Sequence, residues 1–258
     1  MDQINSISFI GSGNVATHLA IAVKKAGYDV KEIYSLNQEN AIELAQKVGC
    51  KAIGSIEQMD QSVDLFLVAV PDETIEKVIK NFPFVNGIVA HTSGITPMEV
   101  LNRERQFGVF YPLQTFSKQR ELNISAVPFC IEASTDDVLV QLKELAMKLS
   151  ESVFEIDSDE RKYLHLTAVL VNNYSNYLFK AAYDILEAKN IDHSILMPLI
   201  EETISKIKDI TPREAQTGPA SRNDIKTIEK HLILLNEYPQ YKDLYKIFAD
   251  QLIKKYNE

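Results

Sequence analysis

The sequence predicts an α/β fold, in which a Rossmann-type, doubly wound and mainly parallel sheet is followed by an all-α C-terminal domain. Two observations lead to this prediction. Up to about residue 156, short apolar runs alternate with helical patterns, as in a parallel sheet covered on both faces. After about residue 157, strand-like runs largely disappear and long helical patterns replace them. We therefore expect two domains, residues 1–156 and 157–258, without a low-complexity linker between them.

Seven apolar runs have the length of strands, and they cover residues 4–10, 29–34, 64–70, 87–91, 107–110, 127–132 and 152–156. Apolar residues recur three and four positions apart between most of these runs, which indicates helices around residues 15–23, 41–48, 75–79 and 139–149. The run from Leu65 to Val70 has no polar alternation, as expected of a strand buried on both sides. In the second domain the patterns predict helices over about residues 159–189, 194–208, 223–236 and 241–256.

The composition excludes several classes of function. The chain has 258 residues, of which 45% are hydrophobic, and its formal net charge of -9 argues against nucleic acid or an anionic membrane as a partner. No apolar stretch approaches the ~20 residues that a transmembrane helix needs, and no signal-type segment is recognised. Cys50 and Cys130 share no metal-ligand spacing with a histidine, so we expect reduced thiols, no metal site and a cytoplasmic protein.

The turn after the first apolar run reads Gly11-Ser12-Gly13-Asn14-Val15-Ala16 and leads into a helical pattern. In such a turn the first glycine permits a tight bend, the second lets a pyrophosphate approach the backbone, and the third small residue lets the helix pack closely on the strand. The N–H groups at the helix N-terminus then face the phosphates. A glycine turn can be purely structural, but this place between a strand and a helix predicts a dinucleotide site. Its expected contacts are Gly11, Ser12, Gly13, Asn14 and Val15.

The end of the second strand indicates which nicotinamide dinucleotide the site binds. Sites selective for NAD usually place Asp or Glu there to bind the ribose 2′-hydroxyl. This strand ends in Ser35-Leu36-Asn37, without a carboxylate that would repel a 2′-phosphate, and Glu32 should lie inside the strand. No Arg or Lys stands there to pair with the phosphate. We predict NADP (NADPH) rather than NAD, with Ser35 and Asn37 as contacts.

Two further strand ends should reach the same site, because ligands of open parallel sheets collect at the carboxyl ends of the strands. Val70 and Pro71 should lie against the adenosine or ribose, and Thr92 and the neighbouring Ser93 should lie near the nicotinamide. Alternatively, Thr92 and Ser93 only cap a helix that starts near Thr96. One residue could do both.

Several stretches resemble one family across nearly the whole chain. They are residues 11–16, 69–72, 91–94, 111–116, the helix around Tyr163, His165 and Asn173, and residues 217–224. The chain resembles two-domain oxidoreductases that depend on NADP or a deazaflavin, with a Rossmann-like N-terminal half and a helical C-terminal domain of unknown function. More distantly, it is similar to pyrroline-5-carboxylate reductase, ketopantoate reductase and the β-hydroxyacid dehydrogenases. The resemblance implies a reductase of small molecules.

Three positions depart from the family pattern. Members often carry Arg where this chain has Leu36, His where it has Tyr111, and Arg-Gly-Asp where it reads Arg222-Asn223-Asp224. The first departure weakens the expectation of NADP. The second replaces a possible proton donor by a phenol.

Hydride transfer to a carbonyl or imine needs a group that polarises the acceptor and supplies a proton. Related dehydrogenases place such residues on the first long helix of the second domain, where this chain has His165 and Asn173. Eight residues apart, the two share a helix face to within about 80°. His165 could act as the acid and Asn173 could donate to the carbonyl oxygen. Lys162 is an alternative acid, and a surface histidine above backbone-bonded polar residues is the structural alternative.

Three residues are expected at the substrate itself. The resemblance implies that Ser93 holds a substrate carboxylate, and Gln114 lies in one of the family's specific stretches. Arg222 stands where the resemblance implies a cleft or a dimer contact, and it could clamp a carboxylate bidentately. A salt bridge from Arg222 to Asp224 or Glu229 is the alternative.

These observations predict an NADP(H)-dependent oxidoreductase that acts on a small, carboxylate-bearing substrate. A homodimer through the helical domain is also expected, because its long apolar helix needs more cover than one small domain gives. Two other functions would use a glycine loop. A non-catalytic NADP(H) sensor would bind the cofactor without hydride transfer, and a methyltransferase would need an acidic residue after the second strand, which this chain lacks.

Overall fold

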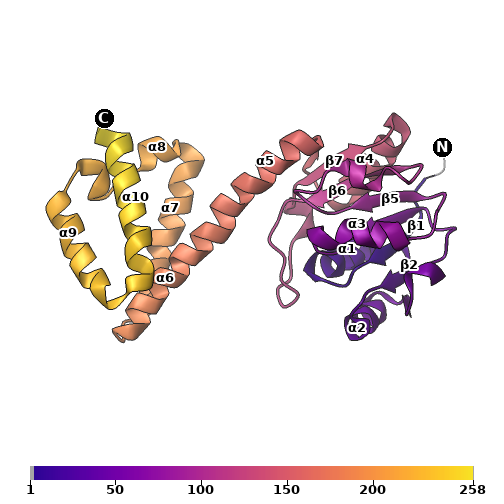
Figure 1. Cartoon of the computed structure of the whole chain (residues 1–258), viewed down its shortest axis with the longest axis horizontal. Coiled ribbons are helices and arrows are strands. Elements are labelled where there is room, and N and C mark those ends of the chain that lie inside the picture. Colours follow the sequence, from indigo (N-terminus) through magenta and orange to yellow (C-terminus); the bar gives the residue numbers. More distant parts are fainter. Residues whose placement is uncertain (1–2, 258) are drawn as a thin grey trace. The chain divides into compact units, whose positions relative to one another are not determined.

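The computed structural model describes residues 3–257 (Figure 1). Contacts divide the chain into two compact units, Met1–Asn172 and Asn173–Glu258. The boundary expected after residue 156 follows the last strand of the sheet, whereas the next helix belongs to the first unit. A buried ion pair, described below, holds that helix to the sheet.

Eight strands form one sheet in the order β3-β2-β1-β4-β5-β6-β7-β8. Their bounds are β1 (Ser6–Ile10), β2 (Asp29–Tyr34), β3 (Lys51–Ile53), β4 (Leu65–Val68), β5 (Ile88–His91), β6 (Phe107–Pro112), β7 (Phe129–Ala133) and β8 (Val153–Glu155). Neighbouring strands are parallel except for β6 and β7, which are antiparallel. The predicted Rossmann-type, mainly parallel sheet is confirmed. The sequence pattern missed β3, because three residues are too few to show a period.

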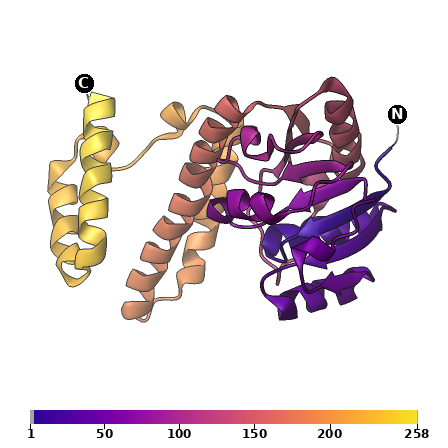
Figure 2. The same ribbon diagram turned by 45° about the vertical axis from the view of Figure 1, so that its right-hand side comes forward.

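The helices between the strands cover both faces of the sheet. They are α1 (Asn14–Lys25), α2 (Gln38–Val48), α3 (Asp72–Asn81) and α4 (Asp136–Leu149). Leu65 and Leu67 of β4 pack in the core with α1, α2 and α4, whereas Phe66 and Val68 pack in the core with α3. Side chains of β4 are therefore buried on both faces, as its unbroken apolar sequence predicted. Figure 2 shows the strands of this sheet from a second direction.

A long helical stretch follows β8. It consists of α5 (Ser158–Ala168), a π-helix (Val169–Tyr174) and α6 (Ser175–Ala188), close to the helix expected over residues 159–189. A π-helix has more residues per turn than an α-helix. The spacing of 3.6 residues per turn, which predicted that His165 and Asn173 share a face, therefore does not hold between them.

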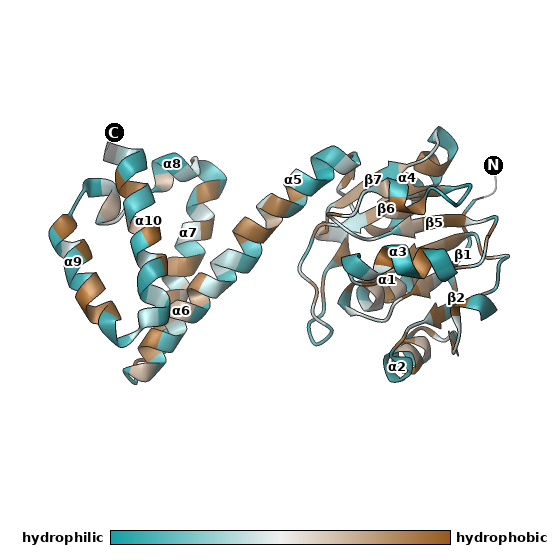
Figure 3. Ribbon diagram, viewed as in Figure 1, coloured by the Kyte–Doolittle hydropathy of each residue, from teal (hydrophilic) through white to brown (hydrophobic). Residues whose placement is uncertain are grey.

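The second unit is helical, and its buried core is small. Its remaining α-helices are α7 (Met197–Asp209), α8 (Pro212–Ala215), α9 (Ile225–Leu234) and α10 (Pro239–Asn257). The buried members of its two apolar clusters are Ala181, Leu235 and Tyr241 in one and Ala220, Ile228 and Ala249 in the other. Helix α7 buries none of its residues, and brown segments recur along α7 and α9 in Figure 3.

The described residues also form short 3₁₀ turns, at Ile56–Gln58, Met98–Leu101, Ile124–Ala126, His193–Leu196, Ala220–Arg222 and Leu235–Glu237. The helix expected to start near Thr96 is only the turn Met98–Leu101. Within residues 3–257, no helix combines the length and the apolar character needed to cross a membrane.

Candidate functional site

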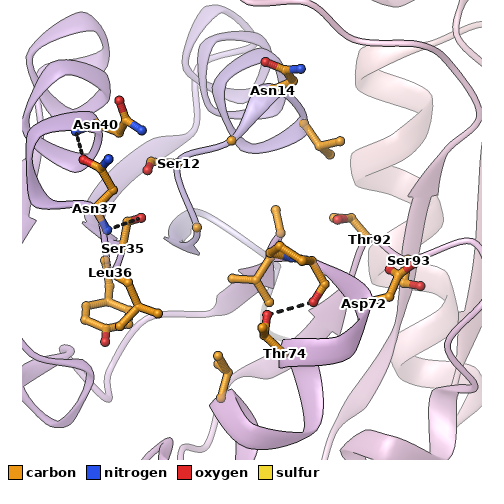
Figure 4. Close-up of a pocket in the computed structure, with 18 of the residues that line it drawn as sticks. Ser12, Asn14, Ser35, Leu36, Asn37, Asn40, Asp72, Thr74, Thr92 and Ser93 are labelled. Carbon is orange, nitrogen blue, oxygen red and sulfur yellow. Dashed lines mark hydrogen bonds between the residues drawn. The ribbon is translucent and has the colours of Figure 1, made fainter.

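A cavity of about 820 Å³ lies within the first unit, at the carboxyl ends of β1, β2, β4, β5 and β6. Its lining includes all ten residues expected to bind a cofactor, which are Gly11, Ser12, Gly13, Asn14, Val15, Ser35, Asn37, Val70, Pro71 and Thr92. Ser93, Gln114 and His165 also line it. Figure 4 shows polar side chains from several of these strand ends around one space. The fold thus brings most of the predicted site residues together.

The two glycines of the first turn do different work. Gly11 has a φ of +120°, and a Cβ atom there would lie 2.1 Å from the carbonyl oxygen of Ala69. Its N–H donates to the carbonyl oxygen of Tyr34 at 2.7 Å, which ties the turn to the end of β2. A Cβ atom on Gly13 would meet nothing within 4 Å. Gly13 therefore faces open space, which is what a pyrophosphate approaching the backbone requires.

The N-terminus of α1 is free to receive an anion. Gly13 is its N-cap and offers no side-chain hydrogen bond, and its first turn has no acidic residue. The N–H groups of that turn therefore keep their capacity for phosphate oxygens. Asn14 is directed elsewhere, because its Nδ2 donates to the carbonyl oxygen of Phe116 at 2.9 Å. Together with the open face of Gly13, this helix end fits the pyrophosphate of a dinucleotide.

The end of β2 offers neutral polar groups. The Asn37 side chain accepts from the N–H of Asn40 and caps α2, and the Ser35 hydroxyl accepts from the N–H of Asn37 (Figure 4). Their O–H and NH₂ groups can still donate. Glu32 is buried inside β2, where it accepts from the N–H of Asp60 at 2.8 Å, and it does not line the cavity. This corner therefore presents donors to the cavity and no carboxylate from β2.

The wall across from β2 comes from β4 and α3. Val70, Pro71 and Asp72 lead into this helix, and the Thr74 hydroxyl donates to the carbonyl oxygen of Pro71 at 2.8 Å (Figure 4). Lys77, one turn further along α3, also lines the cavity.

At the other end of the cavity, Tyr111 and His165 form a hydrogen-bonded pair. The Tyr111 hydroxyl lies 3.2 Å from Nδ1 of His165. Burial raises the pKa of Tyr111 to about 12, so the phenol stays protonated at neutral pH. The phenol can then donate to Nδ1, and a neutral imidazole in that bond carries its own proton on Nε2. The Nε2–H group of His165 is therefore not used by Tyr111 and can donate to another group.

Gly94 makes room for this pair. A Cβ atom on Gly94 would lie 2.5 Å from Nδ1 of His165 and 2.8 Å from Cζ of Tyr111. Both are far below normal contact distances, so a larger residue would displace one of the two rings. Gly94 is required here for close approach rather than for a turn.

A buried ion pair fixes the helix that carries His165. Arg161, four residues earlier on α5, is 1% exposed and pairs with Glu132 of β7. Its guanidinium also donates to the carbonyl oxygen of Thr96 at 2.7 Å and to the Ser158 hydroxyl at 3.0 Å. These bonds join α5, β7 and the segment after β5. Lys162, the alternative acid, is exposed, pairs with Asp159 at 2.6 Å and does not line the cavity.

Ser93 uses its hydroxyl locally. Its Oγ accepts from the N–H groups of Ile95 at 3.2 Å and Thr96 at 2.9 Å, and it lies 2.9 Å from the Thr96 hydroxyl. These bonds close a local turn before Met98–Leu101, whose N-cap is Pro97 without a side-chain cap, so the expected helix cap is not formed, although Ser93 also lines the cavity. Gln114 accepts from the N–H of Thr115 through Oε1, which leaves its NH₂ group able to donate.

Two predicted residues belong to the second unit. Asn173 lies in the π-helix and Arg222 ends the turn Ala220–Arg222, and both side chains are exposed. The salt bridge of Arg222 to Asp224 or Glu229 is not formed within residues 3–257, since no ion pair of Arg222 is found there and Asp224 caps α9 instead. Their proposed roles stay predictions. Within the same range no three His, Cys, Asp or Glu side chains are grouped as a metal site needs.

Sequence reasoning missed several lining residues, which include Asn40 and Lys77. Lys77 is 41 positions from Leu36 in the chain, and only the packing of α3 on the sheet brings it to the cavity. Gly94 lies in the stretch 91–94 that carries the family resemblance, but the need for glycine there could not be read from the sequence, because it comes from the packing of Tyr111 and His165 against it.

One solved structure decides the relationship of this chain to known proteins. It belongs to a protein of Bacteroides fragilis, provisionally described as an NADP oxidoreductase, and shares 36% sequence identity at a TM-score of 0.90. The alignment covers 97% of this chain and 98% of that chain. The chain belongs to this NADP oxidoreductase family. The resemblance inferred from the sequence motifs is confirmed.

Two family models match different parts of the chain. A model described as "NADP oxidoreductase coenzyme F420-dependent" matches residues 6–90, and a domain of unknown function, DUF2520, matches residues 127–252. The second match begins just before β7, so the last part of the sheet is included with the helices.

Two more distant structures share the fold of the family. A 1-pyrroline-5-carboxylate reductase from Streptococcus pyogenes is 15% identical at a TM-score of 0.63, covering 97% of each chain. A reductive aminase from Aspergillus terreus, in complex with NADPH and ethyl-5-oxohexanoate, is 13% identical at a TM-score of 0.71, covering 96% of this chain and 95% of that chain. No curated protein sequence matches this chain at a significant level.

Proposed function

We propose that the protein is an NADP(H)-dependent oxidoreductase that transfers a hydride to or from the carbonyl or imine carbon of a small, carboxylate-bearing substrate. The observation that carries the proposal is that the Tyr111–His165 pair and the glycine turn at Gly11 and Gly13 line the same cavity. A phosphate-binding helix end and a proton donor are the two parts that such a reductase has to combine.

The chain's residues divide the work. When bound, NADPH supplies the hydride. The open backbone at Gly13 and the free N–H groups of α1 would hold the pyrophosphate, and Ser35 and Asn37 would hold the adenosine ribose and its phosphate. Protonated His165 would donate its Nε2 proton to the oxygen or nitrogen of the acceptor and become neutral, while Tyr111 orients the ring through Nδ1.

The substrate class is supported by the relatives rather than by a bound molecule. The name of one similar protein includes 1-pyrroline-5-carboxylate, a cyclic imine that bears a carboxylate. The name of another refers to reductive amination. Ser93 and Gln114 would contact such an acceptor from the cavity wall, with Asn173 and Arg222 as further candidates from the helical unit. The family description also makes coenzyme F420 an acceptor to assay with NADPH.

We also propose a cytoplasmic location and a homodimer formed through the helical unit. The free thiols Cys50 and Cys130 support the first, because disulfides are rare in the cytoplasm. The exposed apolar side chains of the helical unit support the second.

Cofactor binding is tested by a thermal-shift titration with NAD⁺, NADH, NADP⁺ and NADPH. We expect NADPH to raise the melting temperature most, because the β2 corner has no carboxylate and offers donors to a phosphate. If none of the four nucleotides shifts the melting temperature at millimolar concentration, the proposal fails. Binding of NADPH without turnover of any carbonyl, imine or F420 acceptor would instead favour the alternative function, a non-catalytic NADP(H) sensor.

The roles at the substrate are tested by steady-state kinetics, once an acceptor is found. We expect His165→Ala to lower kcat by about 10²-fold or more with little change in the Kd for NADPH, since a general acid contributes about that much. Tyr111→Phe should lower kcat less, because the acid is present but no longer oriented. Lys162→Ala, a charge change on the same helix but outside the cavity, is the control. Equal effects of Lys162→Ala and His165→Ala would remove His165 from the mechanism.

A further inference from the structure

The wall of the cavity across from the end of β2 contains a cation that sequence reasoning did not find. Lys77 lies on α3, and it is the one Lys or Arg among the described residues that line the cavity. The segment after β2, where a cation for a 2′-phosphate was sought, instead has Leu36, which is 86% exposed at the cavity rim. Figure 4 shows Ser35, Leu36 and Asn37 across the cavity from Asp72 and Thr74 at the start of the same helix.

The packing of α3 explains why Lys77 faces the cavity. Ile75 and Ile79, four residues apart, are buried in the core and fix the rotation of the helix. The residues at helical spacing on the adjoining face all line the cavity, and they are Thr74, Lys77, Val78 and Asn81. Because β1 lies between β2 and β4, the helix that follows β4 meets the end of β2 across the glycine turn.

Lys77 has no competing partner on its own helix. Glu73, one turn earlier, is placed for an i,i+4 pair, yet no ion pair of Lys77 exists within residues 3–257. Lys80 does form such a pair, with Glu76 at 2.7 Å. Asp72, the carboxylate of the cavity lining, is five residues before Lys77 and is therefore rotated by about 140° around the helix.

The groups around Lys77 suit a phosphorylated adenosine. Leu36, Ile56 and Val78 supply apolar surface on which a purine ring can pack. Ser35, Asn37 and Asn40 supply neutral donors, which can bind a hydroxyl or a phosphate. A cation on the opposite wall, with no carboxylate from β2, favours the charged phosphate over the neutral hydroxyl.

We propose that Lys77 binds the 2′-phosphate of NADP(H) and makes the site prefer NADP(H) over NAD(H). An arginine after β2 would both pack on the adenine and pair with the phosphate. In this chain Leu36 supplies the apolar contact from one wall and Lys77 supplies the charge from the other. This assignment rests on the proposed function, because it requires that the cavity holds a nicotinamide dinucleotide.

The test measures binding rather than turnover. Dissociation constants are determined for NADPH, NADH, 2′,5′-ADP and 5′-AMP with the wild-type protein, Lys77→Ala, Lys77→Arg and Lys80→Ala. Lys80 is the matched control, because it has the same charge on the same helix but pairs with Glu76 and does not line the cavity. The two adenosine phosphates have no nicotinamide and so report on this corner alone.

We expect Lys77→Ala to weaken NADPH and 2′,5′-ADP by roughly tenfold, as for the loss of one charged hydrogen bond at a partly exposed site. NADH and 5′-AMP should change less than about twofold, Lys77→Arg should retain most of the preference, and Lys80→Ala should resemble the wild-type protein. The assignment is overturned if Lys77→Ala leaves NADPH binding unchanged, or weakens NADPH and NADH equally.

The result separates this assignment from the proposed reaction. Selective loss of 2′-phosphate binding in a protein that reduces no acceptor would support Lys77 and reject the oxidoreductase. A wild-type protein that turns over with NADH as well as NADPH, and binds them equally, would reject Lys77 and keep the oxidoreductase. A wild-type protein that binds none of the four ligands would reject both.

Discussion

Gly11 and Gly13 are two residues apart, but the structure needs them for different reasons. Gly11 adopts a φ of +120° and lies against the backbone of Ala69, just after β4, so its lack of a side chain serves the fold. Gly13 has a φ of −74° and an open Cβ direction, so its lack of a side chain leaves space for a ligand. The same amino acid thus serves packing at one position and binding at the other.

Alanine at each position should separate these two roles. Gly13→Ala should melt within a few degrees of the wild-type protein, since its backbone suits alanine, yet bind NADPH about tenfold or more weakly. Gly11→Ala should be destabilised by more than about 1–3 kcal/mol, because of its φ and the 2.1 Å contact. Differential scanning fluorimetry and NADPH fluorescence titration measure both quantities. Normal NADPH affinity in Gly13→Ala would refute the binding role of this turn.

A buried histidine should make stability depend on pH. His91, at the end of β5, is fully buried, and burial, with Arg161 as the second cause, lowers its pKa to about 3. In the unfolded chain the pKa is near 6.5, so between these values the unfolded state binds a proton that the folded state does not. The contribution of His91 is therefore fully present above about pH 6.5 and is lost as the pH falls toward 3.

We expect this residue to remove up to about 1.4 kcal/mol of unfolding free energy for each unit of pH below 6.5. Urea unfolding at several pH values between 7.5 and 4.5 measures the slope, and His91→Gln keeps an acceptor for the N–H of Ser93 while removing the titration. The variant should show a flatter dependence than the wild-type protein. Parallel slopes for the two proteins would show that His91 is not the cause.

At the residue scale, the sequence predicted what local chain order determines. Gly11 to Val15, Ser35 and Asn37 lie where strands end, and the parallel sheet gathers strand ends, so their shared cavity could be foreseen. Lys77 could not be foreseen, and neither could the steric need for glycine at position 94, because each depends on a neighbour that only tertiary packing supplies. Glu32 was correctly expected inside its strand.

Among the elements, α5 is held to the sheet by the bonds of a single side chain, Arg161. Arg161 joins it to β7 through Glu132 and to the segment after β5 through Thr96, and the Ser158 hydroxyl donates to Glu132 and accepts from the N–H of Met98. Removing one member of a buried ion pair leaves the other charge without compensation. The network therefore both stabilises the first unit and fixes the position of His165.

Arg161→Met should lower the unfolding free energy by about 3–5 kcal/mol, because it leaves the Glu132 carboxylate without a compensating charge. The double variant with Glu132→Gln should recover part of that loss. Lys143→Met, which breaks the exposed pair with Glu155, is the control and should cost less than about 1 kcal/mol. Urea denaturation measures all three, and a loss for Arg161→Met as small as the control's would show that the network is not stabilising.

The elements themselves were largely predictable from the sequence. Hydrophobic periods identified seven of the strands and the helices α1 to α4, and they placed the long helix after β8 within a residue or two. The periods could not show β3, which is too short, or the π-helix Val169–Tyr174, which has no sequence period of its own within six residues.

For the whole molecule, the main open feature is the apolar surface that the helical unit exposes. Its buried side chains are few, and α7 exposes Leu199, Ile204 and Ile207. Monomeric proteins rarely leave large contiguous apolar surface in water. We propose that a second copy of the chain covers these helices in a homodimer.

Sedimentation velocity should give twice the chain mass of 29.2 kDa at micromolar concentration. Ile204→Lys should shift the protein toward the monomer, because it would bury an unpaired charge in the interface. Glu201→Lys, an exposed substitution on the same helix, should leave the mass unchanged. A wild-type protein that sediments as a monomer at all concentrations would contradict the homodimer.

The antiparallel pairing of β6 and β7 also limits how this chain can be divided. Residues 127–252 match one family model, but β7, α4 and β8 complete the sheet, and Phe110 of β6 packs against Phe129 of β7 at 4.9 Å between ring centroids. A fragment that ends before residue 127 would expose the edge of β6, a strand that is almost wholly buried in the full chain, and leave its backbone open to pairing with other molecules. Anyone who expresses the cofactor-binding half alone should therefore cut beyond α5, in the helix where sequence comparison sees no boundary at all.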